Sequence, residues 1–277
     1  MITRRRFLVE VAVGVGVTAL GSRAWGSMPP PPPALDEILG ESPAITALRD
    51  SMRRLLGSLG TERRPPPVVI VGETGSGKGL VASVLHRAGP RAAGPFVPVR
   101  VPAIPDFLLE SELFGFAPRP CPEATRGRPG LIQVAHHGVL LLEYMSFTPE
   151  RVRLNVLQTI ERGAVRRMDA TRDEPADIWL ITSEDGPDVC RPPGAIVLTI
   201  PPLRERGDDV LLLADHFLHR YSRDYQIPEK TLSRSARAAL RSHCWPGNVR
   251  ELACVMEQAM LLAGERIEPI DLGLPTV

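Results

Sequence analysis

The sequence predicts an α/β fold built on a parallel β-sheet, and three observations support this. Residues 68–71 are four consecutive β-branched residues, which is typical of a strand that is buried on both faces. Further apolar, strand-like runs at residues 139–142, 178–182 and 196–200 alternate with helical stretches, as expected for an α/β fold. Towards the C-terminus, helices are predicted at residues 208–221 and 233–242, and a third helix from residue 248.

Composition excludes several classes of protein. The chain has 277 residues, a formal net charge of +1 and 43% hydrophobic residues, so it can form a core and has no bulk charge to recruit nucleic acid. Its 29 prolines are about twice the usual share of roughly 5%. The four cysteines show no metal-binding spacing and are too few for a disulfide scaffold.

The N-terminal residues 1–27 have the layout of a twin-arginine export signal. Residues 4–8 read Arg-Arg-Arg-Phe-Leu, and a weakly apolar run follows, then small residues. The apolar run is too short to span a membrane, and Glu10 interrupts it. The alternative is a spurious upstream extension, with Met28 as the true start. Residues 28–34 are predicted to be a stiff polyproline linker.

A glycine-rich loop follows the first predicted strand. Residues 72–78 read Gly-Glu-Thr-Gly-Ser-Gly-Lys, and an apolar helical pattern comes directly after them. A strand, G-x-x-x-x-G-K and a helix in this order are the phosphate-binding P-loop. Its glycines let backbone N–H groups face the phosphates, the helix start adds a positive dipole, and the lysine adds a charge. We therefore expect ATP to be bound by Gly72, Glu73, Thr74, Gly75, Ser76, Gly77, Lys78 and Gly79. Gly79 stands where the general motif has a Ser or Thr that holds magnesium.

Six motifs then occur in one order between residues 35 and 262. They are Ile-Leu-Gly-Glu-Ser-Pro-Ala at 38–44, Gly-Glu-Thr-Gly at 72–75, Ala-Ile-Pro at 103–105, Leu-Glu-Ser-Glu-Leu-Phe-Gly at 109–115, Pro-Pro-Leu-Arg-Glu-Arg at 201–206 and Trp-Pro-Gly-Asn-Val-Arg-Glu-Leu at 245–252. Together they resemble the central AAA+ ATPase domain of bacterial enhancer-binding proteins, the sigma-54-dependent transcription activators.

This resemblance implies a fold, an organisation and one further binding residue. Residues 35–206 are expected to form the AAA+ domain, with helices on both faces of the parallel sheet, and residues 207–277 a small helical lid. Arg250 matches the lid arginine that reaches the terminal phosphate of ATP in the family. The family also suggests oligomeric rings, of one kind of chain or of several. From the sequence itself, Asn248 and Glu251 are three residues apart, which predicts a capping box.

The chain departs from the family where the chemistry takes place. The family has an Asp-Glu pair at the end of a strand, for magnesium and for the attacking water, and the matching residues here are Glu143 and Tyr144. Glu143 is therefore the candidate catalytic residue and magnesium ligand, although it is one methylene longer than Asp and Mg²⁺ demands near-octahedral geometry. Tyr144 is a phenol that stays protonated at neutral pH. Losing a general base costs about 10²–10⁴ in rate.

Two further segments differ. Residues 184–194, where the family presents arginine fingers, contain three prolines, two glycines and a single arginine, Arg191. A missing finger costs roughly 10³–10⁵ in rate. Residues 119–124, Arg-Pro-Cys-Pro-Glu-Ala, replace the GAFTGA loop that touches the sigma factor, so contact with sigma-54 is not expected. The chain ends at Val277, soon after the lid, so direct DNA binding is not expected either.

Three functions remain open. The first is a degenerate AAA+ module, a pseudo-ATPase that binds ATP or ADP and acts in transcription regulation or as an assembly partner. The second is an active ATPase that activates sigma-54 RNA polymerase, with Glu143 in place of the aspartate. The third is an exported binding protein with a relic P-loop. Because the surviving motifs need ATP, we expect the cytoplasm rather than export.

Overall fold

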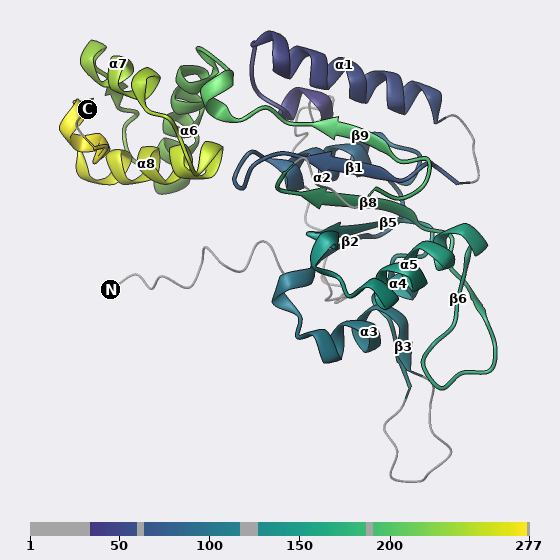
Figure 1. The fold of residues 1–277 in the computed structure, drawn as a ribbon. Helices are drawn as coiled ribbons and strands as arrows, with labels where there is room; N and C mark the ends of the chain where they lie inside the picture. Colours follow the sequence, from purple (N-terminus) through teal and green to yellow (C-terminus); the bar gives the residue numbers. More distant parts are fainter. Residues whose placement is uncertain (1–33, 60–63, 117–126, 187–190, 276–277) are drawn as a thin grey trace, which may run out of the picture. The chain divides into compact units, whose positions relative to one another are not determined.

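A parallel sheet forms the centre of the structure, a computed structural model that describes residues 34–59, 64–116, 127–186 and 191–275. Its five strands lie in the order β2-β5-β8-β1-β9, and all neighbouring pairs are parallel (Figure 1). The strands are β1 (Val68–Val71), β2 (Phe96–Arg100), β5 (Val139–Glu143), β8 (Trp179–Glu184) and β9 (Ile196–Thr199). The expected α/β fold is thus confirmed, with all three predicted apolar runs in strands.

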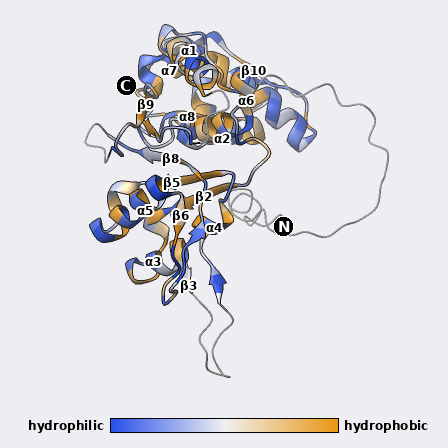
Figure 2. Ribbon diagram, turned by 90° about the vertical axis from the view of Figure 1, so that its right-hand side faces the viewer, coloured by the Kyte–Doolittle hydropathy of each residue, from blue (hydrophilic) through white to orange (hydrophobic). Residues whose placement is uncertain are grey.

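Helices cover both faces of this sheet, because alternate residues of each strand point to opposite sides. In β5, Val139 and Leu141 pack in the cluster that includes α1 and α2, whereas Leu140 and Leu142 pack with α3, α4 and α5. Strands β2 and β5 are largely hydrophobic in Figure 2. The helices are α1 (Pro43–Ser58), α2 (Lys78–Ala88), α3 (Asp106–Phe114), α4 (Leu131–Val134) and α5 (Glu150–Arg162).

A helical region with its own core follows the last strand. The helices are α6 (Asp209–Tyr225), α7 (Arg234–Ser242) and α8 (Asn248–Leu262), joined by the short parallel pair β10 (Thr231–Leu232) and β11 (Arg266–Ile267). Trp245, Leu252 and Met256 are among the fully buried side chains of its core. The three predicted lid helices are present, and α6 runs four residues further than the pattern predicted.

The predicted capping box at the start of α8 is wrong. The N-cap residue is Gly247, not Asn248, and its N–H donates to Glu251 Oε2 at 2.7 Å. Glu251 therefore does reach back to the helix start, but from one position later than a capping box requires. Asn248 is fully buried with φ = +53°, and its side chain bonds to other parts of the molecule. Local spacing identified the helix start but not the partner of the asparagine.

Two short antiparallel pairs project from the sheet region. They are β3 (Gly115–Phe116) with β4 (Arg128–Pro129), and β6 (Ala164–Val165) with β7 (Glu174–Pro175). Across the described ranges, no helix is both long and apolar enough to cross a membrane. The predicted export signal at residues 1–27, the polyproline run and the segment at 119–124 lie outside the described residues.

Candidate functional site

The loop between β1 and α2 begins at the carboxyl end of the sheet. Its first residue, Gly72, donates its N–H to Glu184 O of β8 at 3.1 Å. Gly75 and Gly77 have φ values of +80° and +106°, in the left-handed region that glycine enters without strain. Gly77 is the N-cap of α2, and a Cβ placed there would meet no atom within 4 Å. The turn is therefore tight, and its surface at the helix start is open.

Lys78, the first residue of α2, has a side chain that is only 8% exposed. Its Nζ donates to Gly72 O at 2.8 Å and to Glu73 O at 3.0 Å, and it forms an ion pair with Asp185. The ammonium group is thus held among the loop carbonyls. A positive charge and the free N–H groups of a helix start lie side by side here, and this combination binds anions.

Three features make this loop fit a nucleotide phosphate. The first N–H groups of α2 have no intrahelical acceptor, the open space at Gly77 admits a close approach, and Lys78 supplies the charge. Ser76 lies under the loop: its Oγ is buried, has no partner among the described residues, and is 2.8 Å from a Cβ built on Gly72. Ser76 therefore fixes the loop by packing, while the phosphate-facing groups are backbone N–H groups.

The side chain of Glu73 turns away from the phosphate position. Its carboxylate accepts two hydrogen bonds from Arg204, at 2.6 and 2.9 Å, and one from Asn248 Nδ2 at 3.0 Å. The bonds from Arg204 and then Asn248 lower the pKa of Glu73 to about 2, against the small opposing effect of burial. Glu73 thus stays ionised and fastens the loop to the helical region.

Asn248 is the residue that joins three segments. Its Oδ1 accepts from Leu203 N at 2.8 Å, and its Nδ2 donates to Glu73 Oε2 and, at 3.1 Å, to Thr74 O. Every polar group of this buried amide is therefore used, as a buried amide requires. The sequence pattern had suggested only a local cap, because the partners are 45 and about 175 positions away in the chain.

Arg250 lies against the loop through its backbone. Its N–H donates to Gly75 O at 3.2 Å. A Cβ on Gly75 would lie 2.2 Å from Gly247 O and 3.1 Å from Arg250 Cβ, so only glycine allows this close approach. The guanidinium group is exposed and has no hydrogen bond or ion pair within the described part of the chain.

Glu143 ends strand β5, beside the loop. A Cβ built on Gly79 would lie 3.7 Å from Glu143 Oε1, which is an ordinary contact distance. The carboxylate has no hydrogen bond or ion pair to other described residues. No cluster of three or more His, Cys, Asp or Glu side chains in the described ranges could hold a metal ion. A single carboxylate next to bound phosphates is nevertheless a usual way to hold Mg²⁺, so the donor set fits that ion.

Tyr144 occupies the next position and has a left-handed backbone, with φ = +63°. Its ring lies 5.8 Å from Lys78 Nζ and 5.9 Å from the guanidinium carbon of Arg100, within cation–π range. Its hydroxyl is 3.5 Å from Thr74 Oγ1. A phenol between two cations therefore stands beside the loop lysine.

Asp185, which the sequence did not single out, completes the site from the end of β8. Its carboxylate accepts from Lys78 Nζ and from Thr74 Oγ1. Burial raises the pKa of Asp185, but the hydrogen bonds from Lys78, Thr74 and Tyr144 outweigh burial, so the pKa lies below its usual value. The preceding Glu184 is buried and accepts from Ser146 N and Oγ at 2.8 and 2.7 Å.

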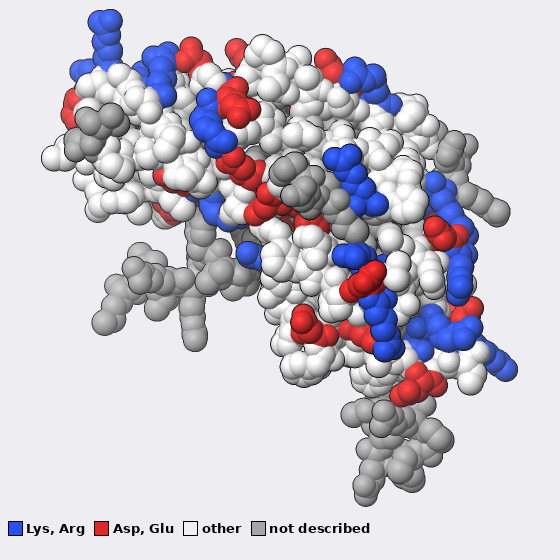
Figure 3. Space-filling view, viewed as in Figure 1, with Lys and Arg blue, Asp and Glu red and all other residues white. Residues whose placement is uncertain are grey.

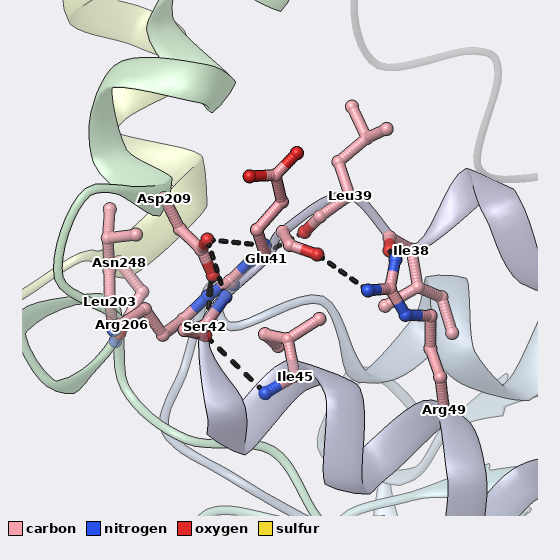
Figure 4. Close-up of polar contacts among 11 residues, drawn as sticks. Ile38, Leu39, Glu41, Ser42, Ile45, Arg49, Leu203, Arg206, Asp209 and Asn248 are labelled. Atoms are coloured by element: carbon pink, nitrogen blue, oxygen red, sulfur yellow. Dashed lines mark hydrogen bonds and ion pairs between the residues drawn. The ribbon is translucent and has the colours of Figure 1, made fainter.

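A buried ion pair fastens the segment before α1 to the start of α6 (Figure 4). Asp209 accepts from Glu41 N at 2.6 Å, from Ser42 N at 3.0 Å and from Ser42 Oγ at 2.7 Å, and Arg206 Nε lies 3.3 Å from it. Burial raises the pKa of Asp209, but the hydrogen bonds from Ser42 and Glu41 and the charge of Arg206 outweigh it, so the pKa is lowered. Two distant motifs of the sequence meet at this pair.

Outside this site, charges of both signs intermix over the face drawn in Figure 3. Around α5 and the β6–β7 pair, arginines are matched by acids, as in Arg151–Glu110, Arg166–Asp173 and Arg167–Glu174. Arg191 is exposed and has no partner among the described residues. Within residues 184–194, the segment expected to carry arginine fingers, residues 187–190 lie outside the described ranges.

Comparison with known proteins places the chain in a family. The model of the sigma-54 interaction domain matches residues 38–187, more than half of the chain, and that of the AAA+ ATPase lid domain matches residues 204–274. The response regulator protein PilR of Pseudomonas aeruginosa is 36% identical over 256 residues, which cover 87% of this chain and 56% of PilR. The transcriptional activator RocR of Bacillus subtilis is 34% identical over 237 residues, covering 81% of this chain and 50% of RocR.

Solved structures agree with this placement. The crystal structure of NtrX from Brucella abortus in complex with ADP superposes with a TM-score of 0.74 at 26% identity, covering 86% of this chain and 54% of NtrX. The complex of NtrX with ATP gives a TM-score of 0.74 at 25% identity, covering 86% and 56%. The chain spans about half the length of the curated relatives it matches. The chain therefore belongs to the sigma-54 interaction domain family and continues into an AAA+ ATPase lid domain.

Proposed function

We propose that this chain is the nucleotide-binding module of a sigma-54-type transcription regulator that holds ATP or ADP and hydrolyses ATP slowly or not at all. The observation that carries the proposal is the contrast at the site itself. Lys78 and the helix start offer a complete phosphate-binding group, while the position beside them that needs a base holds Tyr144. The similar NtrX structures with bound ADP and ATP support nucleotide binding.

In this proposal the loop residues 72–79 bind the phosphates. Backbone N–H groups at the start of α2 donate to phosphate oxygens, and Lys78 neutralises their charge. Glu73 contributes indirectly, because its bonds to Arg204 and Asn248 hold the loop against the lid. The exposed guanidinium of Arg250 is the group that reaches the terminal phosphate from the lid.

Magnesium is assigned to Glu143, whose Oε1 lies 3.7 Å from a Cβ built on Gly79 at the start of α2. The ion would neutralise phosphate charge and keep several waters of its own, as Mg²⁺ does at nucleotide sites. Because its side chain is longer than that of aspartate, Glu143 fixes the position of its carboxylate less precisely. This is consistent with a site that binds ATP and hydrolyses it slowly.

Slow hydrolysis follows from the missing base. A positioned general base supplies about 10²–10⁴ in rate, and a phenol such as that of Tyr144 is not the carboxylate that the family has at this position. The cations around the ring, Lys78 and Arg100, lie within cation–π range and hold that side chain in place. In this proposal the loss of hydrolysis therefore follows from the residue at position 144.

The wider biology is proposed on the same basis. Residues 35–206 act as the nucleotide-binding domain and 207–277 as its lid, and the chain works in the cytoplasm within a homo- or hetero-oligomeric ring. Its partner is another regulator or an assembly factor, because residues 119–124, Arg-Pro-Cys-Pro-Glu-Ala, differ from the family's sigma-54-contacting loop.

A working ATPase that activates transcription is the second candidate. It is favoured by the retained carboxylate of Glu143 and by relatives such as the transcriptional activator RocR. The two candidates share nucleotide binding and differ only in turnover, so one preparation can separate them.

The test exploits the lysine content of the chain. The sequence contains two lysines, Lys78 and Lys230, so a lysine-reactive acyl phosphate of ATP has two targets. We expect it to label Lys78 and to be displaced by excess ATP or ADP. Fluorescent ATP should bind to the wild type and lose affinity roughly 100-fold or more in Lys78→Ala, the cost of removing a buried charged partner.

Lys230→Ala is the matched control, because Lys230 bonds to Ala263 O in the lid and lies outside the loop. It should bind fluorescent ATP like the wild type. Equal retention of the nucleotide by the wild type and Lys78→Ala would refute nucleotide binding by this loop.

A further inference from the structure

The ammonium group of Lys78 has no donor to spare. A lysine offers three N–H donors, and the described residues supply three acceptors, namely Gly72 O, Glu73 O and the carboxylate of Asp185. Two of these acceptors are backbone groups that belong to the loop fold. The third is a side-chain anion from another strand, and it is the one that a ligand can replace.

Asp185 is fixed in this position from several sides. Thr74 Oγ1 donates to the second carboxylate oxygen, so both oxygens are bonded to groups of the loop. The residue before it, Glu184, receives the N–H of Gly72 on its carbonyl at 3.1 Å. The side chain is 34% exposed, so it lies at the mouth of the site and not under it. These hydrogen bonds therefore hold the carboxylate of Asp185 in a defined position.

Nucleoside triphosphates and nucleoside diphosphates are expected to interact differently with the carboxylate of Asp185. In a P-loop the backbone N–H groups hold the α- and β-phosphates, and the lysine reaches the β- and γ-phosphates. A third phosphate brought to Lys78 adds negative charge next to Asp185, and like charges disfavour each other strongly at short range. A diphosphate keeps the backbone contacts and adds no group at the position of the third phosphate.

We propose that Asp185 is a nucleotide-specificity residue, whose carboxylate holds Lys78 in place of a third phosphate and so biases the site towards nucleoside diphosphates. The inference rests on the proposed nucleotide binding and deepens it. It gives the module a resting state in which ADP is preferred, and ATP binds only by displacing the Lys78–Asp185 ion pair.

The experiment measures the dissociation constants of fluorescent ADP and ATP for the full chain, with and without Mg²⁺. The wild type should prefer ADP. Asp185→Asn keeps the size of the side chain and removes its charge, so it should tighten ATP binding about tenfold and change ADP binding less than about threefold. Asp185→Ala should shift the ratio of the two constants in the same direction.

Asp224→Asn is the matched control. It changes the net charge by the same amount and removes an exposed ion pair with Arg220 within α6. The ratio of ATP to ADP affinity should be that of the wild type. Melting temperatures without nucleotide show whether each variant is folded.

The outcomes separate the two proposals. If the wild type binds nucleotide and Asp185→Asn leaves the ATP-to-ADP ratio unchanged, the specificity role is refuted while nucleotide binding stands. If Asp185→Asn weakens binding of Mg-ATP, the carboxylate is a ligand of the bound complex, and the role is refuted in another way. If neither protein binds either nucleotide, the proposed function fails, and this inference fails with it.

Discussion

The loop at residues 72–78 and the ends of strands β5 and β8 lie in contact. They differ in how many of the functional groups of a nucleotide site they provide. The loop offers Lys78, left-handed glycines and a helix start, the set of groups that phosphate binding requires. The strand ends offer Glu143, which has no hydrogen bond or ion pair to other described residues, Tyr144 between two cations, and Asp185 bonded to the loop lysine.

This difference is the basis of the proposal that the chain keeps phosphate binding and has lost cleavage. Groups that hold a phosphate are mostly backbone and depend on the fold, so they persist wherever the loop folds. Groups that cleave a phosphate are side chains with one required chemistry, and we propose that Tyr144 replaces such a group here. The predictions below test each half of the comparison.

The largest expected effect is a gain of hydrolysis at the strand end. Tyr144→Glu places a carboxylate where the family's base would lie, so phosphate release from ATP should rise about 10²-fold, the lower end of what a general base supplies. Tyr144→Gln has nearly the same shape without the charge and should stay at the wild-type rate. A wild type that already releases phosphate as fast as Tyr144→Glu would contradict the comparison.

The next effect is on the stability of the fold that carries both the loop and the strand ends. The side chains of Asp209 and Arg206 are 3% and 4% exposed, and removing one partner of a buried pair costs about 3–5 kcal/mol of unfolding free energy. Asp209→Asn should lose about this much in urea unfolding at pH 7. The adjacent Asp208 is 77% exposed, so Asp208→Asn should lose less than about 1 kcal/mol.

The same ion pair should make the free energy of unfolding depend on pH in the acid range. Because the folded pKa of Asp209 is lowered, its contribution is present above the unfolded pKa of about 3.9 and is lost as the pH falls through the folded value. The stability difference between the wild type and Asp209→Asn should therefore shrink below pH 4. A difference that is constant from pH 7 to pH 3 would show that Asp209 stabilises the fold by packing alone.

Much of the fold follows from local patterns, whereas the connections within the site do not. The β-branched run at 68–71 and the loop after it specify a strand, a turn and a helix from neighbouring residues only, and the structure has β1 and α2 there. Asn248 and Asp185 act through partners about 175 and 107 positions away. Spacing along the chain carries no signal for such contacts, so the asparagine was misassigned as a cap and the aspartate was not singled out.

A smaller effect is expected where the loop touches the lid. Gly75→Ala forces a Cβ to within 2.2 Å of Gly247 O at a φ of +80°, and such strain costs of order 1–3 kcal/mol. The lid should separate from the loop, and ATP affinity should fall about tenfold. Gly57→Ala in α1 is the control, because a Cβ there has no atom within 4 Å and alanine favours a helix. Unchanged ATP affinity in Gly75→Ala would show that ATP binding does not depend on the contact between the loop and the lid.

The smallest effect is expected at the exposed ion pair beside the loop. The side chains of Arg204 and Glu73 are 43% and 40% exposed, so Arg204→Ala should leave the free energy of unfolding nearly unchanged and change ATP affinity less than about threefold. Arg237→Ala, which removes a comparable exposed pair with Asp215, should have a similarly small effect on stability. A tenfold loss of ATP affinity in Arg204→Ala alone would assign Arg204 a direct role in the nucleotide site.

The most direct test is to measure bound nucleotide and multiple-turnover phosphate release on one preparation of the full chain. We expect nucleotide that is retained in the wild type and lost in Lys78→Ala, with slow or no phosphate release from the wild type. Phosphate release over many cycles that disappears in Glu143→Gln would contradict the account, because it would mean that the strand end still cleaves what the loop holds.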